Sequence, residues 1–308
     1  MLRQALLLAS RNKLLTRAAT TAPGVGALVG RFAAGETTAD AVTATRALVG
    51  RGFQVSLDHL GEDTLHRDQA DATRDAYVSV LRALADEGLT AHAEVSVKLS
   101  AVGQALAGDG PKIATENAHA ICSAATEVGT TVTLDMEDHT TTDLTLETLA
   151  TLRHDFPATG GVLQAYLHRT EADCADLAHA GSRIRLCKGA YSEPESVALQ
   201  SRHDVDLAYV RCLSILMAGS GYPMLATHDP RLIEIGTDLA SRSARAADSY
   251  EFQMLYGVRP SAQADLVAAG ATMRVYVPYG SEWYGYLVRR MAERPANLLL
   301  GARAMVGH

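Results

Sequence analysis

Residues 131–167 read TVTLDMEDHTTTDLTLETLATLRHDFPATGGVLQAYL. The stretch opens with a short apolar run at 131–136, continues with apolar residues at helical spacing over 144–154, and ends in a second apolar run at 162–167. Two strands separated by a helix of this length are typical of a βαβ unit, in which the strands lie parallel.

The same alternation recurs along most of the chain. The predicted strands are 52–57, 94–99, 131–136, 162–167, 183–186, 223–227, 250–254 and 273–277. The predicted helices are 64–87, 113–128, 144–154, 171–180, 195–218, 231–242, 260–269 and 281–294. Eight strands alternating with helices fit a closed βα (TIM-like) barrel better than a six-stranded open sheet, so we expect an α/β barrel.

The sequence divides into two parts. No Gly/Ser-rich or Pro-rich linker interrupts the repeats after about residue 50, so we expect one catalytic barrel over 51–308 and an N-terminal helical extension over 1–50. Residues 24–30 (GVGALVG) resemble a dinucleotide-binding loop, but they follow no predicted strand, and a turn entering a helix is the better interpretation. Residues 2–15 contain an apolar run too short to span a membrane; a helix packed on the barrel is favoured over a transit peptide, and we expect a cytoplasmic protein.

Composition excludes several functions. The chain has 308 residues, 47% of them hydrophobic, and 35 acidic against 28 basic residues give a net charge of −7. An acidic chain disfavours nucleic acid as a partner. The four cysteines form no CxxC pair, so we expect reduced thiols rather than a zinc module or disulfides.

Polar residues stand at the ends of nearly all predicted strands. They are Lys98, Asp135, Gln164, Arg185, Thr227, His228, Gln253 and Tyr276. In a parallel barrel the carboxyl ends of the strands meet at one mouth, where the chemistry lies. Buried charges are costly unless they are paired, so this mixed-sign set predicts a ligand-binding site there.

The segment around Asp135 also admits a metal site. Carboxylate and imidazole ligands are present in Asp135, Glu137 and His139. The last two lie beyond the strand and are equally suited to the start of the next helix, so no metal is predicted.

The last predicted helix carries two adjacent arginines. Tyr286, Arg289, Arg290 and Glu293 share one helical face, because they stand at i, i+3, i+4 and i+7. A solvated face with an Arg289–Glu293 ion pair would explain this pattern. A helix that follows the eighth strand lies beside the barrel mouth, however, and there the guanidinium groups are suited to clamp a carboxylate or phosphate.

Several of these segments together resemble the proline dehydrogenase family. They are VSVKLS at 95–100, LDMED at 134–138, RLCKGAY at 185–191, ATH at 226–228, FQML at 252–255 and YLVRR at 286–290. The resemblance extends from residue 58 to 297 in the same order and includes the N-terminal helical extension. It implies a distorted eight-stranded βα barrel of the small monofunctional bacterial form, which binds FAD and oxidises L-proline to Δ1-pyrroline-5-carboxylate.

The resemblance also implies a cofactor site. Arg185 would lie near N5 of the flavin, where a cation stabilises the reduced form, and Gln164 would contact the isoalloxazine ring. Lys188, Gly189 and Ala190 would line the phosphate and ribose. Further cofactor contacts fall on Tyr191, Thr227, His228 and Gln253.

On the substrate side, the resemblance assigns Lys98, Arg289 and Arg290 to the proline carboxylate, and Leu255 and Tyr286 to the pyrrolidine ring. Asp135 and Tyr276 join Arg185 as catalytic residues, and we expect Asp135 to organise the site through Lys98 or Tyr276 rather than to abstract a proton. Glu62 would pair with the first arginine as a gate that excludes water.

Two alternatives remain open. A hydroxyproline dehydrogenase of the same family is disfavoured by the bulky Tyr286, because hydroxyproline-preferring relatives carry a smaller residue there. A flavin-free barrel that binds carboxylates is the alternative from another class. The resemblance further implies a quinone acceptor, peripheral contact with the inner membrane through residues 2–15, and a separate pyrroline-5-carboxylate dehydrogenase as metabolic partner.

Overall fold

The computed structural model describes residues 30–61, 64–283 and 286. Its strands form a closed parallel barrel in sequence order, and β8 pairs with β1 to close it. The strands are β1 Gln54–His59, β2 Ala93–Val97, β3 Val132–Leu134, β4 Gly160–Gln164, β5 Arg183–Cys187, β6 Tyr222–Ala226, β7 Glu251–Leu255 and β8 Met273–Tyr279. The predicted α/β fold, an eight-stranded βα barrel, is therefore confirmed.

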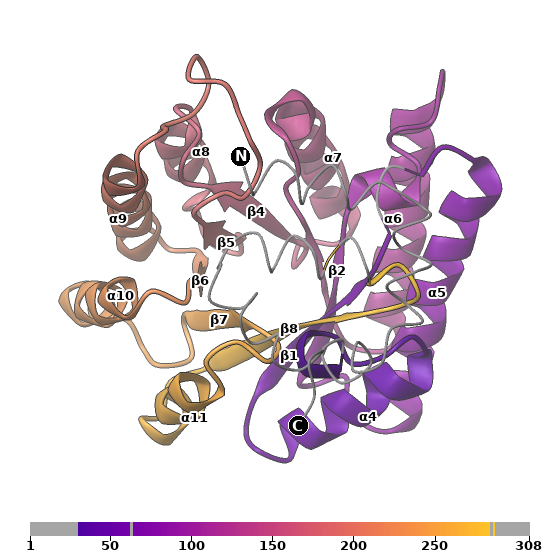
Figure 1. Ribbon diagram of the computed structural model, residues 1–308, viewed down its shortest axis with the longest axis horizontal. Helices are drawn as coiled ribbons and strands as arrows, with labels where there is room; N and C mark the ends of the chain where they lie inside the picture. The colour runs from indigo at the N-terminus through magenta and orange to yellow at the C-terminus, as the bar shows by residue number, and fades with distance from the viewer. Residues whose placement is uncertain (1–29, 62–63, 284–285, 287–308) are drawn as a thin grey trace, which may run out of the picture.

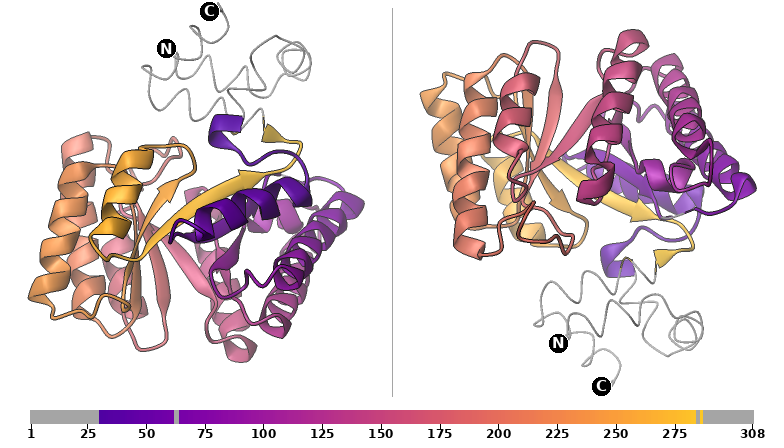
Figure 2. Two further views of the ribbon diagram at one scale, coloured as in Figure 1. Left: turned by 90° about the horizontal axis from the view of Figure 1, so that it is seen from below. Right: turned by 90° about the horizontal axis from the view of Figure 1, so that it is seen from above.

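Helices surround the strands as an outer ring (Figure 1), and the side views show them running along the barrel wall (Figure 2). They are α4 Thr38–Val49, α5 Arg67–Asp86, α6 Gly110–Glu127, α7 Thr142–Asp155, α8 Thr170–Leu177, α9 Arg202–Ala218, α10 Pro230–Arg242 and α11 Pro260–Ala268. Two short 3-10 helices, Leu99–Val102 and His139–Thr141, follow β2 and β3. No helix in the described ranges is both long and apolar enough to cross a bilayer.

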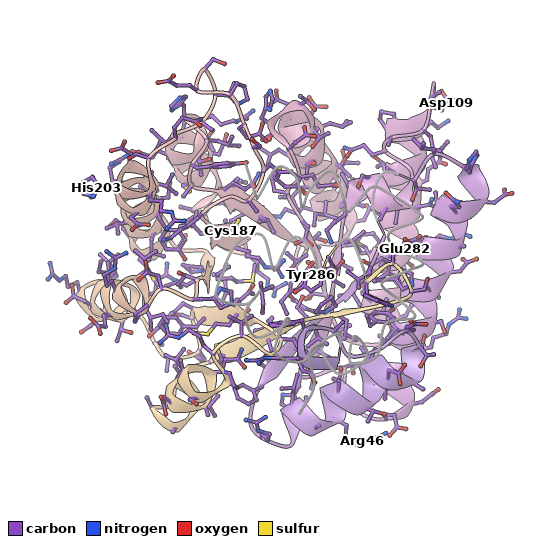
Figure 3. The ribbon with its side chains drawn as sticks, viewed as in Figure 1. Arg46, Asp109, Cys187, His203, Glu282 and Tyr286 are labelled. Carbon is purple, nitrogen blue, oxygen red and sulfur yellow. The ribbon has the colours of Figure 1, made fainter. Side chains whose placement is uncertain are left out.

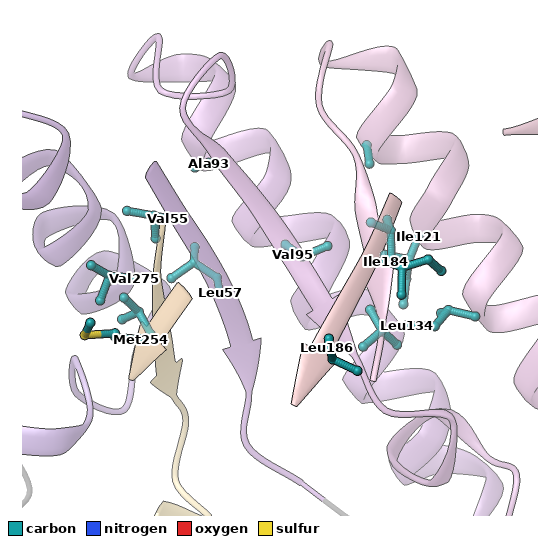
Figure 4. Close-up of a cluster of buried hydrophobic side chains, with 14 of the residues drawn as sticks. Val55, Leu57, Ala93, Val95, Ile121, Leu134, Ile184, Leu186, Met254 and Val275 are labelled. Carbon is teal, nitrogen blue, oxygen red and sulfur yellow. The ribbon is translucent and has the colours of Figure 1, made fainter. Parts of the chain in front are cut away.

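The outward faces of the strands form the hydrophobic core. Buried strand residues such as Val55, Val95, Ile184 and Val275 belong to one hydrophobic cluster with helical residues such as Ile121 of α6 (Figure 4). Burial of each such side chain contributes about 1.5–3 kcal/mol. The core therefore lies between the strands and the helical ring.

The inward faces are polar instead. Side chains of β5 reach those of β1, β2 and β7, which are not its neighbours in the sheet, so the contacts pass through the barrel interior. Most parallel barrels fill this space with aliphatic side chains. Here, among the described residues, four cations are paired with four carboxylates: Lys98, Arg183, Arg185 and Arg274 with Asp58, Glu94, Asp135 and Glu251.

The observed elements begin and end within a few residues of the predicted ones, with one large exception. The helix predicted over 195–218 begins at Arg202, where Ser201 caps it by accepting a hydrogen bond from the backbone N–H of Asp204. The preceding residues are held elsewhere, because Leu199 donates its backbone N–H to Tyr166 and Ala198 forms a bridge with Leu167. Ten of the 14 residues of the helix predicted over 281–294 lie outside the described residues.

The segment before α4 is attached to the end of β8. The backbone N–H of Ala34 donates to Pro278 O at 2.9 Å, and that of Gly280 donates to Gly35 O at 2.9 Å. Trp283 Nε1 donates to Glu36 Oε1, also at 2.9 Å. These contacts place residues 34–36 of the predicted extension beside the carboxyl end of β8. The division at residue 50 stays a prediction, and residues 2–15 lie outside the described ranges.

Candidate active site

The carboxyl ends of the strands bring together the polar residues expected there. Arg185 of β5 is at the centre of this group and is 4% exposed. Its Nη1 donates to Asp135 Oδ1 at 2.6 Å and to Ser96 Oγ at 2.8 Å, while Nε donates to Gln253 Oε1 at 2.5 Å. Bonds between a guanidinium and a carboxylate are among the stronger hydrogen bonds in proteins, so Arg185 is held in a fixed orientation.

Tyr276 completes the contacts of Asp135. Its hydroxyl donates to Asp135 Oδ2 at 2.7 Å, and its ring lies 5.3 Å from the guanidinium carbon of Arg185. Burial raises the pKa of Tyr276, and the neighbouring Asp135 carboxylate raises it further. The phenol therefore stays protonated and serves as a donor.

Lys98 has a partner that the sequence analysis missed. Its Nζ lies 2.8 Å and 2.9 Å from the two carboxylate oxygens of Asp58 but 3.9 Å from Asp135. Burial raises the pKa of Asp58 against the opposing effect of Lys98. β1 extends two residues beyond its predicted end, and this brings Asp58 into the mouth. The signal that could have revealed Asp58 is its position two residues after Ser56, which puts the two side chains on the same face of the strand.

The loop after β5 begins with Lys188, which pairs with Asp206 and Asp229. Arg231 contacts the same two carboxylates, so the four charges balance. This cluster lies where β5 and β6 lead into α9 and α10, at the carboxyl-terminal end of the barrel.

Gly189 permits a backbone conformation that side chains disfavour. Its φ is +110°, and a Cβ at this position would lie 2.3 Å from the ring of Tyr166. Tyr166 is 7% exposed and its hydroxyl donates to Glu193, so the ring has little room to move. The loop can approach Tyr166 this closely only with glycine at position 189.

Gly189→Ala should therefore lower the free energy of unfolding by about 1–3 kcal/mol through backbone strain and by a further ~1–3 kcal/mol through the collision. Urea unfolding followed by circular dichroism measures the change. Gly181→Ala is the matched control, since Gly181 has φ +81° and no atom within 4 Å of an added Cβ. Equal losses in the two variants would contradict the assigned role of Tyr166.

The other predicted site residues also lie around the mouth. Gln164 is buried and its Nε2 donates to Glu137 O at 2.7 Å. Thr227 Oγ1 accepts from the backbone N–H of Asp229, and His228 Nε2 accepts from that of Leu255 at 2.9 Å, so this ring nitrogen carries no proton. Ala190 and Tyr191 are exposed.

Of the residues predicted to bind the substrate, Lys98, Leu255 and Tyr286 are among the described residues. Tyr286 is buried at 6% exposure, and in the view of Figure 3 it lies with Cys187 near the centre of the ring, while Arg46 and His203 lie at the outer edge. Glu62, Arg289, Arg290 and Glu293 lie outside the described residues.

The residues considered for a metal are bound to different partners. Asp135 binds Arg185, Glu137 accepts from Ser100, and His139 pairs with Glu193. Within the described part of the chain, no three His, Cys, Asp or Glu side chains are grouped as metal ligands would be.

Below Arg185, the barrel interior contains a second, lower layer of ion pairs that the sequence analysis did not predict. Glu94 pairs with Arg183 at 2.7 Å, and Arg274 pairs with Glu251 at 2.7 Å. Burial would raise the pKa of Glu94, but the neighbouring arginines 274, 183 and 185 hold it well below its usual range. This layer lies directly beneath Arg185, whose Nη2 is 3.7 Å from Glu94 Oε1.

Comparisons with known proteins show which family the chain resembles. Residues 41–299 match the sequence model of the family described as proline dehydrogenase. The chain is 39% identical over 281 residues to a proline dehydrogenase of Deinococcus radiodurans, covering 91% of this chain and 90% of the relative. It is 36% identical over 297 residues to proline dehydrogenase 1 of Bacillus subtilis (strain 168), covering 96% of both chains.

Solved structures show the same fold. The crystal structure of proline utilization A from Bdellovibrio bacteriovorus, inactivated by N-propargylglycine, superimposes with a TM-score of 0.79 at 26% identity. The match covers 87% of this chain and 32% of that one, so this chain spans about a third of the larger protein. The family match covers most of the chain and includes every strand of the barrel, and we conclude that the chain belongs to the proline dehydrogenase family.

Proposed function

We propose that this protein oxidises L-proline to Δ1-pyrroline-5-carboxylate with a non-covalently bound FAD as hydride acceptor. The observation that carries the proposal is Arg185, a buried cation fixed at the centre of the mouth by Asp135 and Gln253. Membership of the proline dehydrogenase family supports the reaction.

The residues at the mouth fit the cofactor. Arg185, in the middle of β5, and Gln164, the last residue of β4, carry guanidinium and amide N–H groups, and such donors suit the nitrogen- and oxygen-rich edge of an isoalloxazine ring. Gly189 lets the loop after β5 pack closely against Tyr166, and this loop would line the phosphate and ribose of the cofactor. When bound, FAD supplies a two-electron acceptor whose reduced form is stabilised by a nearby positive charge.

Lys98 and the two arginines would share the proline carboxylate. Because Asp58 already balances the charge of Lys98, the ammonium serves mainly as a hydrogen-bond donor. The net positive charge for the substrate would then come from Arg289 and Arg290, together with their bidentate geometry. Leu255 and Tyr286 would hold the ring, and Glu62 would close the site.

Asp135 is best suited to an organising role. Its two oxygens accept hydrogen bonds from Arg185, Ser96 and Tyr276. These bonds engage both oxygens of the carboxylate and hold it between β5 and β8. We assign it the positioning of Arg185 and Tyr276, while proline loses its amine proton to solvent or before it binds.

The visible absorption spectrum of the purified protein tests the proposal. We expect the bands of oxidised flavin and their bleaching when L-proline is added without oxygen. Protein that is colourless and takes up no FAD would contradict the cofactor and favour a flavin-free barrel. Colour that L-proline does not bleach would contradict the substrate.

The same assay separates proline from hydroxyproline. Tyr286 is buried, and a phenol over the ring leaves little room for an added hydroxyl. Proline should bleach the flavin faster than trans-4-hydroxy-L-proline does, and the reverse order would favour the hydroxyproline dehydrogenase.

We further propose that electrons pass to a quinone, that residues 2–15 bring the protein to the membrane surface, and that a separate pyrroline-5-carboxylate dehydrogenase consumes the product. Co-sedimentation with anionic vesicles, before and after reduction by proline, tests the membrane contact. Absence of the protein from the pellet in both states would contradict it.

A further inference from the structure

Gln253 connects Arg185 to a second buried charge. Its Oε1 accepts from Arg185 Nε at 2.5 Å, and its Nε2 donates to Glu251 Oε1 at 2.5 Å. An arginine can only donate and an ionised carboxylate can only accept. The chemistry of the two neighbours therefore fixes which end of the amide faces each of them.

Glu251 is itself immobilised. It is 0% exposed, and Arg274 contacts both of its oxygens, at 2.7 Å and 3.0 Å. The hydroxyl of Tyr222 donates to Oε2 at 3.1 Å. Both glutamate oxygens are thus occupied from the side away from the mouth, and the carboxylate provides a rigid base for Gln253.

Arg185 is consequently held at two edges. Gln253 binds Nε, and Asp135 binds Nη1 at 2.6 Å. Two bonds at different edges of a planar guanidinium fix both its direction and its rotation. Gln253 in turn bonds to Glu251 of the lower layer of the barrel.

We propose that Glu251 and Gln253 are positioning residues that set the orientation of Arg185 and, through it, the reduction potential of the bound flavin. This inference rests on the proposed function. Without Gln253, Nε of Arg185 loses its acceptor while Glu94 lies 3.7 Å from Nη2. The guanidinium would then shift deeper into the barrel, away from the mouth, and would stabilise the anionic reduced flavin less.

The first test is Gln253→Met, which keeps the size of the side chain and removes both hydrogen bonds. We expect the equilibrium constant for flavin reduction to fall about tenfold, which corresponds to a potential lower by about 30 mV for two electrons. The turnover number should fall with it, while KM for L-proline changes little. Potentials are measured on the flavin-loaded full chain by equilibration with a reference dye.

Tyr222→Phe is the matched control. It removes a hydrogen bond from the opposite oxygen of Glu251 and leaves the bond to Gln253 in place. Its flavin potential should stay close to that of the wild type, because Arg274 still holds both oxygens of Glu251. A shift in Tyr222→Phe as large as in Gln253→Met would show that general loosening of the interior, rather than this chain of hydrogen bonds, changes the potential, and it would overturn the inference.

Gln253→Glu should make the flavin potential depend on pH, which a simple loss of packing at this position would not do. When protonated, the introduced carboxyl can donate to Glu251 and accept from Arg185, as the amide does; when ionised, it repels Glu251. The potential and turnover of this variant should approach wild-type values at low pH and fall as pH rises, beyond any change in the wild type. If Gln253→Met does not fold, the pH dependence of the potential in Gln253→Glu tests the inference instead.

The outcomes distinguish the two proposals. A wild-type protein that binds no flavin, or whose flavin L-proline does not bleach, overturns the proposed function and this inference with it. Bleaching by L-proline in the wild type, combined with unchanged potentials in both Gln253 variants at every pH, overturns the positioning role alone.

Discussion

Replacing Arg185 with methionine should lower the turnover number for L-proline by a factor of about 10²–10³, the effect of removing a preorganised donor from a developing negative charge. The variant loses the buried cation at the centre of the mouth, together with its bonds to Asp135 and Gln253. Single-turnover bleaching of the flavin by saturating L-proline measures the step directly. Arg185→Lys, which retains the charge without the planar fork, should recover part of the rate.

Arg183→Met is the control for this experiment. Arg183 is on the same strand, two residues earlier, and pairs with Glu94 in the lower layer. Its loss should reduce stability while the folded protein keeps most of its turnover. Equal rate losses at positions 183 and 185 would count against a specific role for Arg185 at the flavin.

Arg274→Met should lower the free energy of unfolding by about 3–5 kcal/mol, because it leaves Glu251 buried without its cation. Arg274 binds both oxygens of that carboxylate, and its Nη1 also donates to Val55 O. The free energy of unfolding in urea measures the loss. If the variant does not accumulate in folded form, Arg274→Lys offers a milder change in the same direction.

Arg242→Met is the surface control. Arg242 pairs with Asp238 at 2.8 Å within α10, but its side chain is 74% exposed. An exposed pair of this kind contributes only about 0.2–1 kcal/mol. If the variants at 242 and 274 unfold at the same urea concentration, burial does not control the strength of these ion pairs.

Strand positions were predictable because the outward faces are apolar. Val132 and Leu134 of β3, for instance, stand two residues apart and both pack against the helices. The ends of strands were less predictable, since the inward residues are polar and an apolar run stops early. β1 was predicted to end at residue 57, and it continues to His59. Asp58 lies in this additional part of β1, so it was not predicted as a site residue.

The candidate site was predictable as a set of residues but not as a set of contacts. Lys98 was expected beside Asp135, and the structure pairs it more closely with Asp58. Glu94 and Glu251 were not predicted as interior residues. The alternation of side chains along a strand does not distinguish a residue that faces a polar interior from one that faces solvent. Only closure of the barrel brings these carboxylates to the arginines.

The balanced charges of the interior also restrict how the sequence can change. Replacing Glu251 or Arg274 alone leaves a buried charge, whereas replacing both with apolar residues of similar size is often nearly neutral for stability. A path from one interior arrangement to another therefore crosses an intermediate that folds poorly. Substitutions in the centre of this barrel would have to be acquired as compensating pairs, and libraries that vary one interior position at a time would miss them.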